Sequence, residues 1–162
     1  MQSPLPGQVF CWGSGSTELG NVPDREGVIP FPTRVPNLPG DIIQVECGDQ
    51  FTVALSQSGV VYTFGSSTKG KLGRIPDRNT VGVVEGLRDI FVKFIAVGQG
   101  HSLCIGTNSF GDTAVYGWGN AFRSALPPFS SDVLSAVRIG GLPEDLTPIS
   151  RVPELCGGFC RW

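Results

Sequence analysis

Charged residues are scarce in this chain. They make up 16% of its 162 residues, with 12 Lys and Arg against 14 Asp and Glu, and the net charge is −2. Proteins that bind nucleic acid usually gather basic side chains in a patch that pairs with phosphates, and the sequence contains no such cluster. We therefore expect no nucleic-acid partner.

Long apolar runs and a secretion signal are missing too. The longest uncharged stretches are interrupted by Gly and Pro, and they fall short of the roughly 20 apolar residues that a membrane-spanning helix needs. Residues 1–6 lack the basic segment followed by an apolar one that marks a signal peptide. We therefore expect a protein of the cytoplasm or nucleus that does not contact a membrane.

Histidine and cysteine, the most common ligands of zinc, are few: the chain has one histidine and five cysteines. Three of the cysteines lie within apolar, strand-like runs: Cys11, Cys47 and Cys104. This placement predicts reduced, buried thiols in a reducing compartment. Cys156 and Cys160 lie near the C-terminus, and only His101, in a distant part of the chain, is available to complete a zinc site with them. We predict no metal site and no cofactor.

A single histidine and a match to a phosphate-binding loop could indicate an enzyme, but the surrounding residues do not support either interpretation. His101 has no nucleophile or metal ligand at a catalytic spacing, so a packed structural histidine is the better interpretation. Residues 65–71 match the phosphate-binding loop Gly-x4-Gly-Lys, but Leu72 follows where Ser or Thr would hold magnesium. The residues from Leu72 to Pro76 cannot begin the helix that such a loop needs. We predict that the chain is not an enzyme.

Glycine and proline are abundant, with 23 and 13 residues, and an aromatic–glycine pair returns at a regular interval. The pair occurs three times, at spacings of 52 and 54 residues: Trp12-Gly13, Phe64-Gly65 and Trp118-Gly119. A second glycine marker accompanies it: Gly48, Gly98 and Gly157. Self-similarity at a period of about 50 residues is typical of a repeat architecture. We treat 1–162 as one domain with repeats at 7–58, 59–112 and 113–162.

The repeats are built from short runs rich in β-branched and aromatic residues, which predict strands. The clearest are Ile42–Cys47, Phe51–Leu55, Phe91–Val97 and His101–Ile105. In the first run Ile43, Val45 and Cys47 alternate with polar residues, which is the period of a half-buried strand. Residues 132–137 are consistent with one helical turn, and no stretch holds a helical apolar stripe. The predicted class is all-β.

Pieces of these repeats resemble the regulator of chromosome condensation repeat: Tyr62-Thr63-Phe64-Gly65, Lys71-Leu72-Gly73, and Cys47-Gly48 followed by Thr52-Val53-Ala54-Leu55. The resemblance implies that each repeat supplies one four-stranded antiparallel blade of a β-propeller. It is weakest in the third repeat, where Leu126-Pro127 replaces Leu-Gly and the sequence ends soon after Gly157. The implied fold is an incomplete β-propeller of about three blades, the third truncated. Such a chain is a fragment, a truncated isoform or one part of a larger assembly.

The resemblance gives the repeated aromatic residues, the repeated glycines and His101 a structural role. Trp12, Phe64 and Trp118 recur strictly, which favours blade core over a set that stacks on a ligand. The repeated glycines are expected at turns or close strand contacts. Family members often carry a histidine at the position of His101, where Phe51 stands in the first repeat.

Two loops are candidates for a surface that faces a partner. Asp24-Arg25 and Asp77-Arg78 lie at matching points of the first two repeats. The simpler interpretation, which we favour, is a solvated loop with a surface ion pair of little energetic consequence. The alternative is a repeated docking feature on the propeller rim.

The leading functional hypothesis is a non-enzymatic protein-interaction or scaffold module, because loops on a rigid frame suit protein binding and the resembling family consists mostly of scaffolds and regulatory domains. One alternative, taken from the founding member, is a guanine nucleotide exchange factor for a Ran-like small GTPase. That protein uses a protruding β-wedge, and the sequence shows no additional hairpin for one. Another alternative is a non-functional truncated product.

We also expect self-association through open blade edges. Core-facing candidates would lack a neighbouring blade on one side: Val9, Cys11, Ile43, Val45, Val53 and Leu55. Few charges are available to shield such edges, so the chain should associate with itself, with a partner or with more of its own polypeptide.

Overall fold

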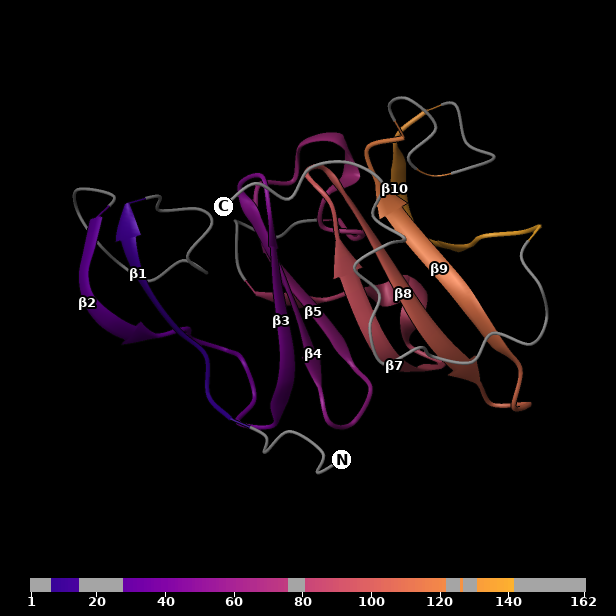
Figure 1. The fold of residues 1–162 in the computed structure, drawn as a ribbon, viewed down its shortest axis with the longest axis horizontal. Coiled ribbons are helices and arrows are strands. Elements are labelled where there is room, and N and C mark those ends of the chain that lie inside the picture. Colours follow the sequence, from indigo (N-terminus) through magenta and orange to yellow (C-terminus); the bar gives the residue numbers. More distant parts are fainter. Residues whose placement is uncertain (1–6, 15–27, 76–80, 122–125, 127–130, 142–162) are drawn as a thin grey trace.

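The computed structural model is all-β. It describes residues 7–14, 28–75, 81–121, 126 and 131–141. Within these residues three antiparallel sheets follow one another along the chain and stand side by side, as Figure 1 shows. Two single-turn 3₁₀ helices, Thr68–Gly70 and Glu85–Leu87, lie between strands. The predicted fold class is confirmed.

The first sheet has two strands, β1 (Phe10–Ser14) and β2 (Val28–Arg34). Pairing of Phe10 with Arg34, and alternation along β1, put Phe10 and Trp12 on one side and Cys11 on the other. The prolines of β2 fall between the paired residues Ile29 and Thr33, where the register shifts. Proline is tolerated there because no ladder hydrogen bond is lost.

The second sheet has the strand order β3-β4-β5-β6. Its strands are Ile42–Gly48, Phe51–Ser56, Val61–Gly65 and Gly82–Val83. All six residues of β4 are buried, because a neighbouring sheet covers each face of this strand. A strand covered on both sides reads as a continuous apolar run, which explains the sequence Phe51-Thr52-Val53-Ala54-Leu55.

The third sheet repeats this plan with the order β10-β9-β8-β7. Its strands are Ile90–Val97, His101–Asn108, Thr113–Gly119 and Val133–Arg138, numbered β7 to β10. The helical turn expected over residues 132–137 is wrong. Val133 pairs with Gly119 and Arg138 with Tyr116, so backbone pairing with β9 overrides the local preference.

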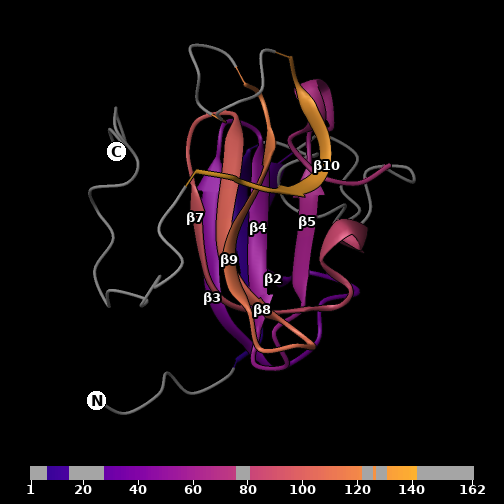
Figure 2. The same cartoon turned by 90° about the vertical axis from the view of Figure 1, so that its right-hand side faces the viewer.

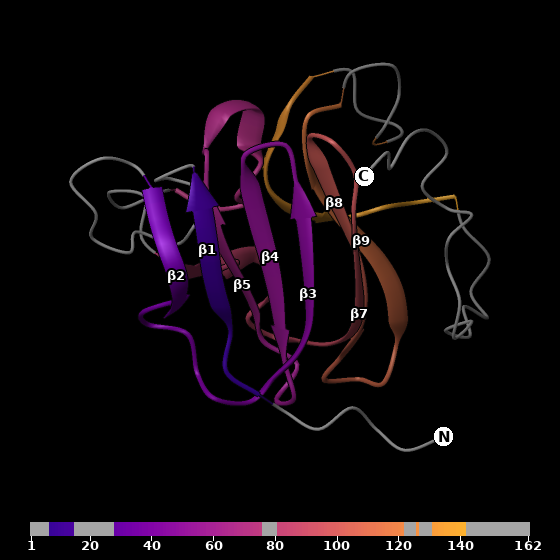
Figure 3. The ribbon, with the colours of Figure 1, turned by 60° about the vertical axis from the view of Figure 1, so that its left-hand side comes forward.

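Two apolar cores hold the stack together, one in each gap between sheets. The smaller core, between the first and second sheets, contains Val35, Leu38, Ile42, Ala54 and Phe64, with Val9 and Cys11 packed against it. The larger core, between the second and third sheets, includes Phe51, Val53, Leu55, Val92, Ile95 and Trp118. Figure 3 shows the three sheets again as successive layers, and Figure 2 looks along the stack with the third sheet in front.

The sheets do not begin and end where the sequence repeats do. The second sheet takes β3 and β4 from residues 7–58 and β5 and β6 from residues 59–112, and the third sheet straddles the next boundary in the same way. Each four-stranded sheet consists of four strands consecutive in the chain, and these four strands span the boundary between two sequence repeats. The two-stranded sheet therefore comes first in the chain. Residues 142–162, which hold the end of the third repeat, lie outside the described residues.

The residues that β3 buries are not the ones expected from the sequence, which were Ile43, Val45 and Cys47. Val45 and Cys47 are exposed, whereas Ile42 is buried and Gln44 is half-buried. A register shift between Ile42 and Gln44 breaks the alternation from which the sequence pattern was interpreted. Of the other expected core residues, Val53 and Leu55 are fully buried, and Val9, Cys11 and Ile43 are half-buried.

Candidate protein-interaction surface

Two of the three aromatics of the aromatic–glycine pairs pack against the preceding sheet, and the third is exposed. Phe64 packs in the smaller core and is 2% exposed, and Trp118 packs in the larger core and is 0% exposed. The Trp118 Nε1–H donates a 3.1 Å hydrogen bond to the carbonyl oxygen of Lys71. Trp12 is 62% exposed, because no sheet of the described residues lies before the first one. Its side of the first sheet is thus an open aromatic face.

The glycines of these pairs share one backbone conformation. Gly13, Gly65 and Gly119 have φ of 111°, 111° and 106°, a region that residues with a Cβ rarely adopt. This turn lets the next backbone N–H reach across the sheet: Ser66 donates to the Gln50 carbonyl at 2.7 Å. The repeated glycine is therefore a requirement of the strand end.

The second marker glycine lies beneath a ring. A Cβ on Gly48 would overlap the ring of Phe51, and one on Gly98 would come within 2.5 Å of the His101 ring. His101 thus occupies the position that Phe51 has in the second sheet. Burial lowers the pKa of His101 from its ordinary value of 6.5. These contacts give the glycine and the ring of each hairpin a shared packing role.

Several predicted positions lie outside the described residues. These are the third marker glycine and the two candidate rim loops: Gly157, Asp24, Arg25, Asp77 and Arg78. Their assignment stays a prediction.

The described thiols and carboxylates do not assemble a metal site. No group of three or more His, Cys, Asp or Glu side chains able to hold an ion occurs among the described residues. Cys104 is buried, and burial raises the pKa of its thiol to about 12, which keeps the sulfur protonated and unreactive. This thiol packs as a small apolar side chain.

Lys71, the lysine of the loop that resembles a phosphate-binding motif, is engaged within the protein. Its Nζ donates to the Asp49 carbonyl oxygen at 2.7 Å and lies 3.2 Å from Oδ2 of Asp49. The ammonium also stands 5.9 Å from the centre of the Phe51 ring, and its side chain is 8% exposed. The segment that follows residue 67 is a three-residue 3₁₀ turn. Lys71 therefore ties the repeat turn to the β3–β4 hairpin.

One structural residue carries no signal in the sequence pattern. Gln44 on β3 reaches the next sheet and mimics a strand partner for Ile95 of β7. Its Nε2 donates to the Ile95 carbonyl oxygen at 2.7 Å, and its Oε1 accepts from the Ile95 N–H at 3.1 Å. Alternation alone marked Gln44 as an outward polar residue. Its partner lies 51 residues away, which explains why sequence reasoning missed it.

The β8–β9 hairpin is longer than its counterpart in the second sheet. Between the paired residues Ile105 and Val115 lie nine residues, against five between Leu55 and Val61. At its tip Phe110 is 88% exposed. Asn108 orders this tip, because its Oδ1 accepts from the N–H groups of Phe110 and Asp112 at 3.0 and 2.9 Å.

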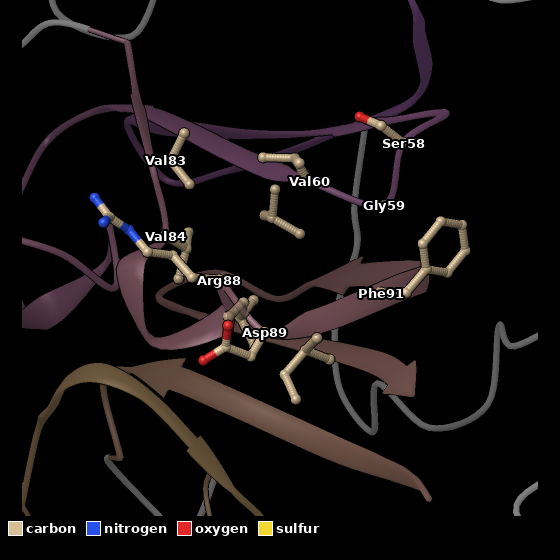
Figure 4. A pocket seen from close by; sticks show the side chains of 11 residues that line it. Ser58, Gly59, Val60, Val83, Val84, Arg88, Asp89 and Phe91 are labelled. Carbon is tan, nitrogen blue, oxygen red and sulfur yellow. The ribbon is translucent and has the colours of Figure 1, made fainter. Parts of the chain in front are cut away.

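A pocket with both apolar and polar walls opens beside this hairpin, between the second and third sheets. Its volume is about 340 Å³, and its walls include Val60, Val83, Leu87, Ile90 and Phe91. Figure 4 shows Arg88 and Phe91 on opposite sides of the pocket. Phe91 is 51% exposed, and Ile90 pairs with Asn108 at the base of the long hairpin. The pocket, Phe91 and Phe110 together form what we term the hairpin-end surface.

The regulator of chromosome condensation (RCC1) repeat profile matches residues 6–55 and 58–105, and a second profile of this repeat matches residues 42–71. The chain belongs to the RCC1 repeat family. Its sheets are accordingly blades of an incomplete RCC1 propeller, as predicted. No helix among the described residues has the length and apolar character needed to cross a membrane.

Three RCC1 proteins show how much of a whole molecule this chain represents. Human E3 ubiquitin-protein ligase HERC2 is 38% identical over 117 residues, which are 70% of this chain and 2% of that protein. Human Regulator of chromosome condensation is 34% identical over 122 residues, 73% of this chain and 27% of that one. The structure of Prp20p from Saccharomyces cerevisiae matches with a TM-score of 0.66 and 24% identity, over 86% of this chain and 36% of Prp20p. The chain thus spans about a third or less of each.

Proposed function

We propose that this RCC1 chain is a non-enzymatic scaffold module that binds a protein partner through the hairpin-end surface. The observation that carries the proposal is the exposure of Phe91 and Phe110 beside a pocket whose walls include Val60, Leu87 and Ile90. Large aromatic side chains in such a setting anchor protein interfaces. The Oδ1 of Asn108 accepts hydrogen bonds from the N–H groups of Phe110 and Asp112, which orders the backbone of the hairpin tip before a partner arrives and reduces the entropy lost on binding.

The relatives support a protein as the class of partner. The structure of Prp20p is described together with its binding to Gsp1p and histones. The free, buried thiol of Cys104 supports a location in the reducing cytoplasm or nucleus. Fluorescence microscopy of the tagged chain tests that location.

Quantitative affinity capture tests the surface. Extracts are passed over the wild type, over Phe91→Ser/Phe110→Ser, and over Ile75→Ser, which removes another exposed apolar side chain, one outside the hairpin-end surface. We expect one or more proteins held by the wild type and by Ile75→Ser to be lost from the double variant. Circular dichroism of each variant checks its fold. The same proteins on all three columns would contradict the proposal.

The second candidate function is nucleotide exchange on a Ran-like GTPase. The 34% identity to human Regulator of chromosome condensation and the long β8–β9 hairpin favour it. The described sheets are only part of a propeller, so we expect this chain not to accelerate nucleotide release from Ran. Release that rises with the concentration of the chain, well above the intrinsic rate, would replace the scaffold proposal.

The third candidate is a truncated product without a function of its own. Exposed apolar side chains such as Trp12 would direct such a chain to degradation. We expect a cellular half-life comparable to that of a stable domain. A half-life of minutes, prolonged by proteasome inhibition, would favour this candidate.

A further inference from the structure

The two ends of the stack carry the two halves of one kind of interface, which the chain already makes twice. In the first gap the ring of Phe64 packs on the first sheet, and in the second gap the ring of Trp118 packs on the second. Both rings are buried almost completely. Each gap therefore joins an aromatic on one sheet to an apolar face on the sheet before it.

The first sheet presents the aromatic half of this interface to solvent. Trp12 has the position in β1 that Phe64 has in β5 and Trp118 in β9. Cys11, its neighbour on β1, packs toward the second sheet, so Trp12 and Phe10 face away from it. Phe10 is 50% exposed and Trp12 62%. We term this side of the first sheet the head face.

The third sheet presents the receiving half. In the second sheet the side that receives Trp118 includes buried apolar residues of β4 and β5: Phe51, Val53, Leu55 and Val61. Strand pairing puts four residues at the equivalent positions of β8 and β9, on the side away from the second sheet: His101, Leu103, Ile105 and Val115. These side chains are only half-buried, whereas their counterparts are fully buried. We term this side of the third sheet the tail face.

We propose that the head face of one copy packs on the tail face of a second copy. A second copy is the partner that we infer, because its tail face offers the head face the same kind of apolar strand surface on which Trp118 packs in the second gap. The contact is heterologous, with a different patch on each copy. It would repeat the rotation between propeller blades, and two copies would together hold six sheets, within the four to eight blades of known propellers.

Sedimentation velocity at micromolar concentrations tests this assembly. The head variant Trp12→Ser removes an exposed ring, and the tail variant Ile105→Thr/Val115→Thr keeps β-branched side chains in both strands while making the face polar. We expect the wild type to gain mass with concentration, and each variant alone to dissociate about tenfold more readily, the effect of losing a central interface side chain. The head variant keeps a tail face and the tail variant keeps a head face. Their mixture should therefore form one-to-one heterodimers and stop there.

Three outcomes overturn the proposal. A wild type that stays monomeric leaves the two faces unused. Association that persists in the tail variant would mean that two head faces meet each other. A third overturning result is a matching loss of association in Ile75→Ser. This variant removes an exposed apolar side chain that lies on neither face, so it is the control for general apolar stickiness. Thermal melts followed by circular dichroism confirm that each variant is folded.

Discussion

Gly13, Gly65 and Gly119 adopt the same backbone conformation in different surroundings. A Cβ on Gly65 would lie 2.5 Å from the Gln50 carbonyl oxygen, and one on Gly119 equally close to that of Gly100, whereas Gly13 has no atom within 4 Å. The difference arises because no described strand flanks β1 as β4 flanks β5. A side chain added at this repeated position would therefore incur backbone strain alone at Gly13, and strain together with a backbone clash at Gly65 and Gly119.

This contrast predicts unequal effects of one substitution. Gly13→Ala is destabilised only because alanine disfavours a positive φ. Gly65→Ala has the same strain and must in addition displace the start of β4. We expect Gly65→Ala to lower the free energy of unfolding by about 1–3 kcal/mol more than Gly13→Ala does. Urea denaturation followed by circular dichroism measures both, with Gly40→Ala, at an open position, as the control. Equal losses would show that the clash is relieved by movement of β4.

A second prediction at this scale concerns pH and His101. Burial lowers the pKa of His101 below 6.5, so in acid the unfolded chain takes up the proton before the folded one. Stability contributed by the neutral ring is therefore present above pH 6.5 and is lost as pH falls toward the folded pKa. His101→Phe should remove this part of the acid sensitivity, because Phe51 already fills the same position over Gly48. Urea midpoints of both proteins between pH 5 and pH 8 provide the measurement, and an unchanged slope would contradict it.

At the scale of elements, Gln44 joins β3 to β7 by two hydrogen bonds to the backbone of Ile95. Ile95 is completely buried, so Gln44→Ala leaves its N–H and carbonyl groups without these bonds. We expect a loss of about 1–3 kcal/mol in the free energy of unfolding, the usual penalty for orphaned buried polar groups. Gln57→Ala, at an exposed turn, is the matched control and should stay within about 0.5 kcal/mol of the wild type. A loss equal to that of the control would mean that water replaces the amide.

The strands were largely predictable from sequence, and their pairings across gaps were not. Phe51–Leu55 and His101–Ile105 contain runs of apolar residues that only a strand buried on both sides, or nearly so, accommodates. The turn expected over residues 132–137 became β10 because a partner strand, absent from any local window, supplied the hydrogen bonds. The role of Gln44 and the exposure of Val45 likewise depend on a register shift in β3, which leaves no mark on the residue pattern.

At the scale of the whole molecule, the period of the repeat predicts the stack of sheets but not where each sheet starts. A repeat can be cut at any point of its cycle, and the hairpins decide which four strands pair. The hairpin-end surface was missed for a related reason. Asn108-Ser109-Phe110 reads as an ordinary turn, and only the register of β8 and β9 reveals the length of the hairpin and the exposure of Phe110.

The stack also predicts an order of local stability, which hydrogen exchange can measure. A blade in a stack is stabilised by its own strands and by its two neighbours, so a blade between two others opens least often. The second sheet has this position, and all of β4 is buried, whereas the first sheet has two strands and one covered face. In dilute solution we expect the amides of β4 to exchange at least about tenfold more slowly than those of β1 and β2.

Hydrogen exchange measured at a higher protein concentration tests whether the copies assemble through the head and tail faces. If head and tail faces meet, exchange should slow in β1, β8 and β9 and stay unchanged in β4, which is already covered. Trp12→Ser should abolish the concentration effect while leaving the order in dilute solution intact, because the Trp12 ring lies in neither core. Exchange in β1 and β2 as slow as in β4 at every concentration would contradict the layered picture. It would mean that the three sheets open together as one cooperative unit, and that the exposed face of the first sheet does not lower its local stability.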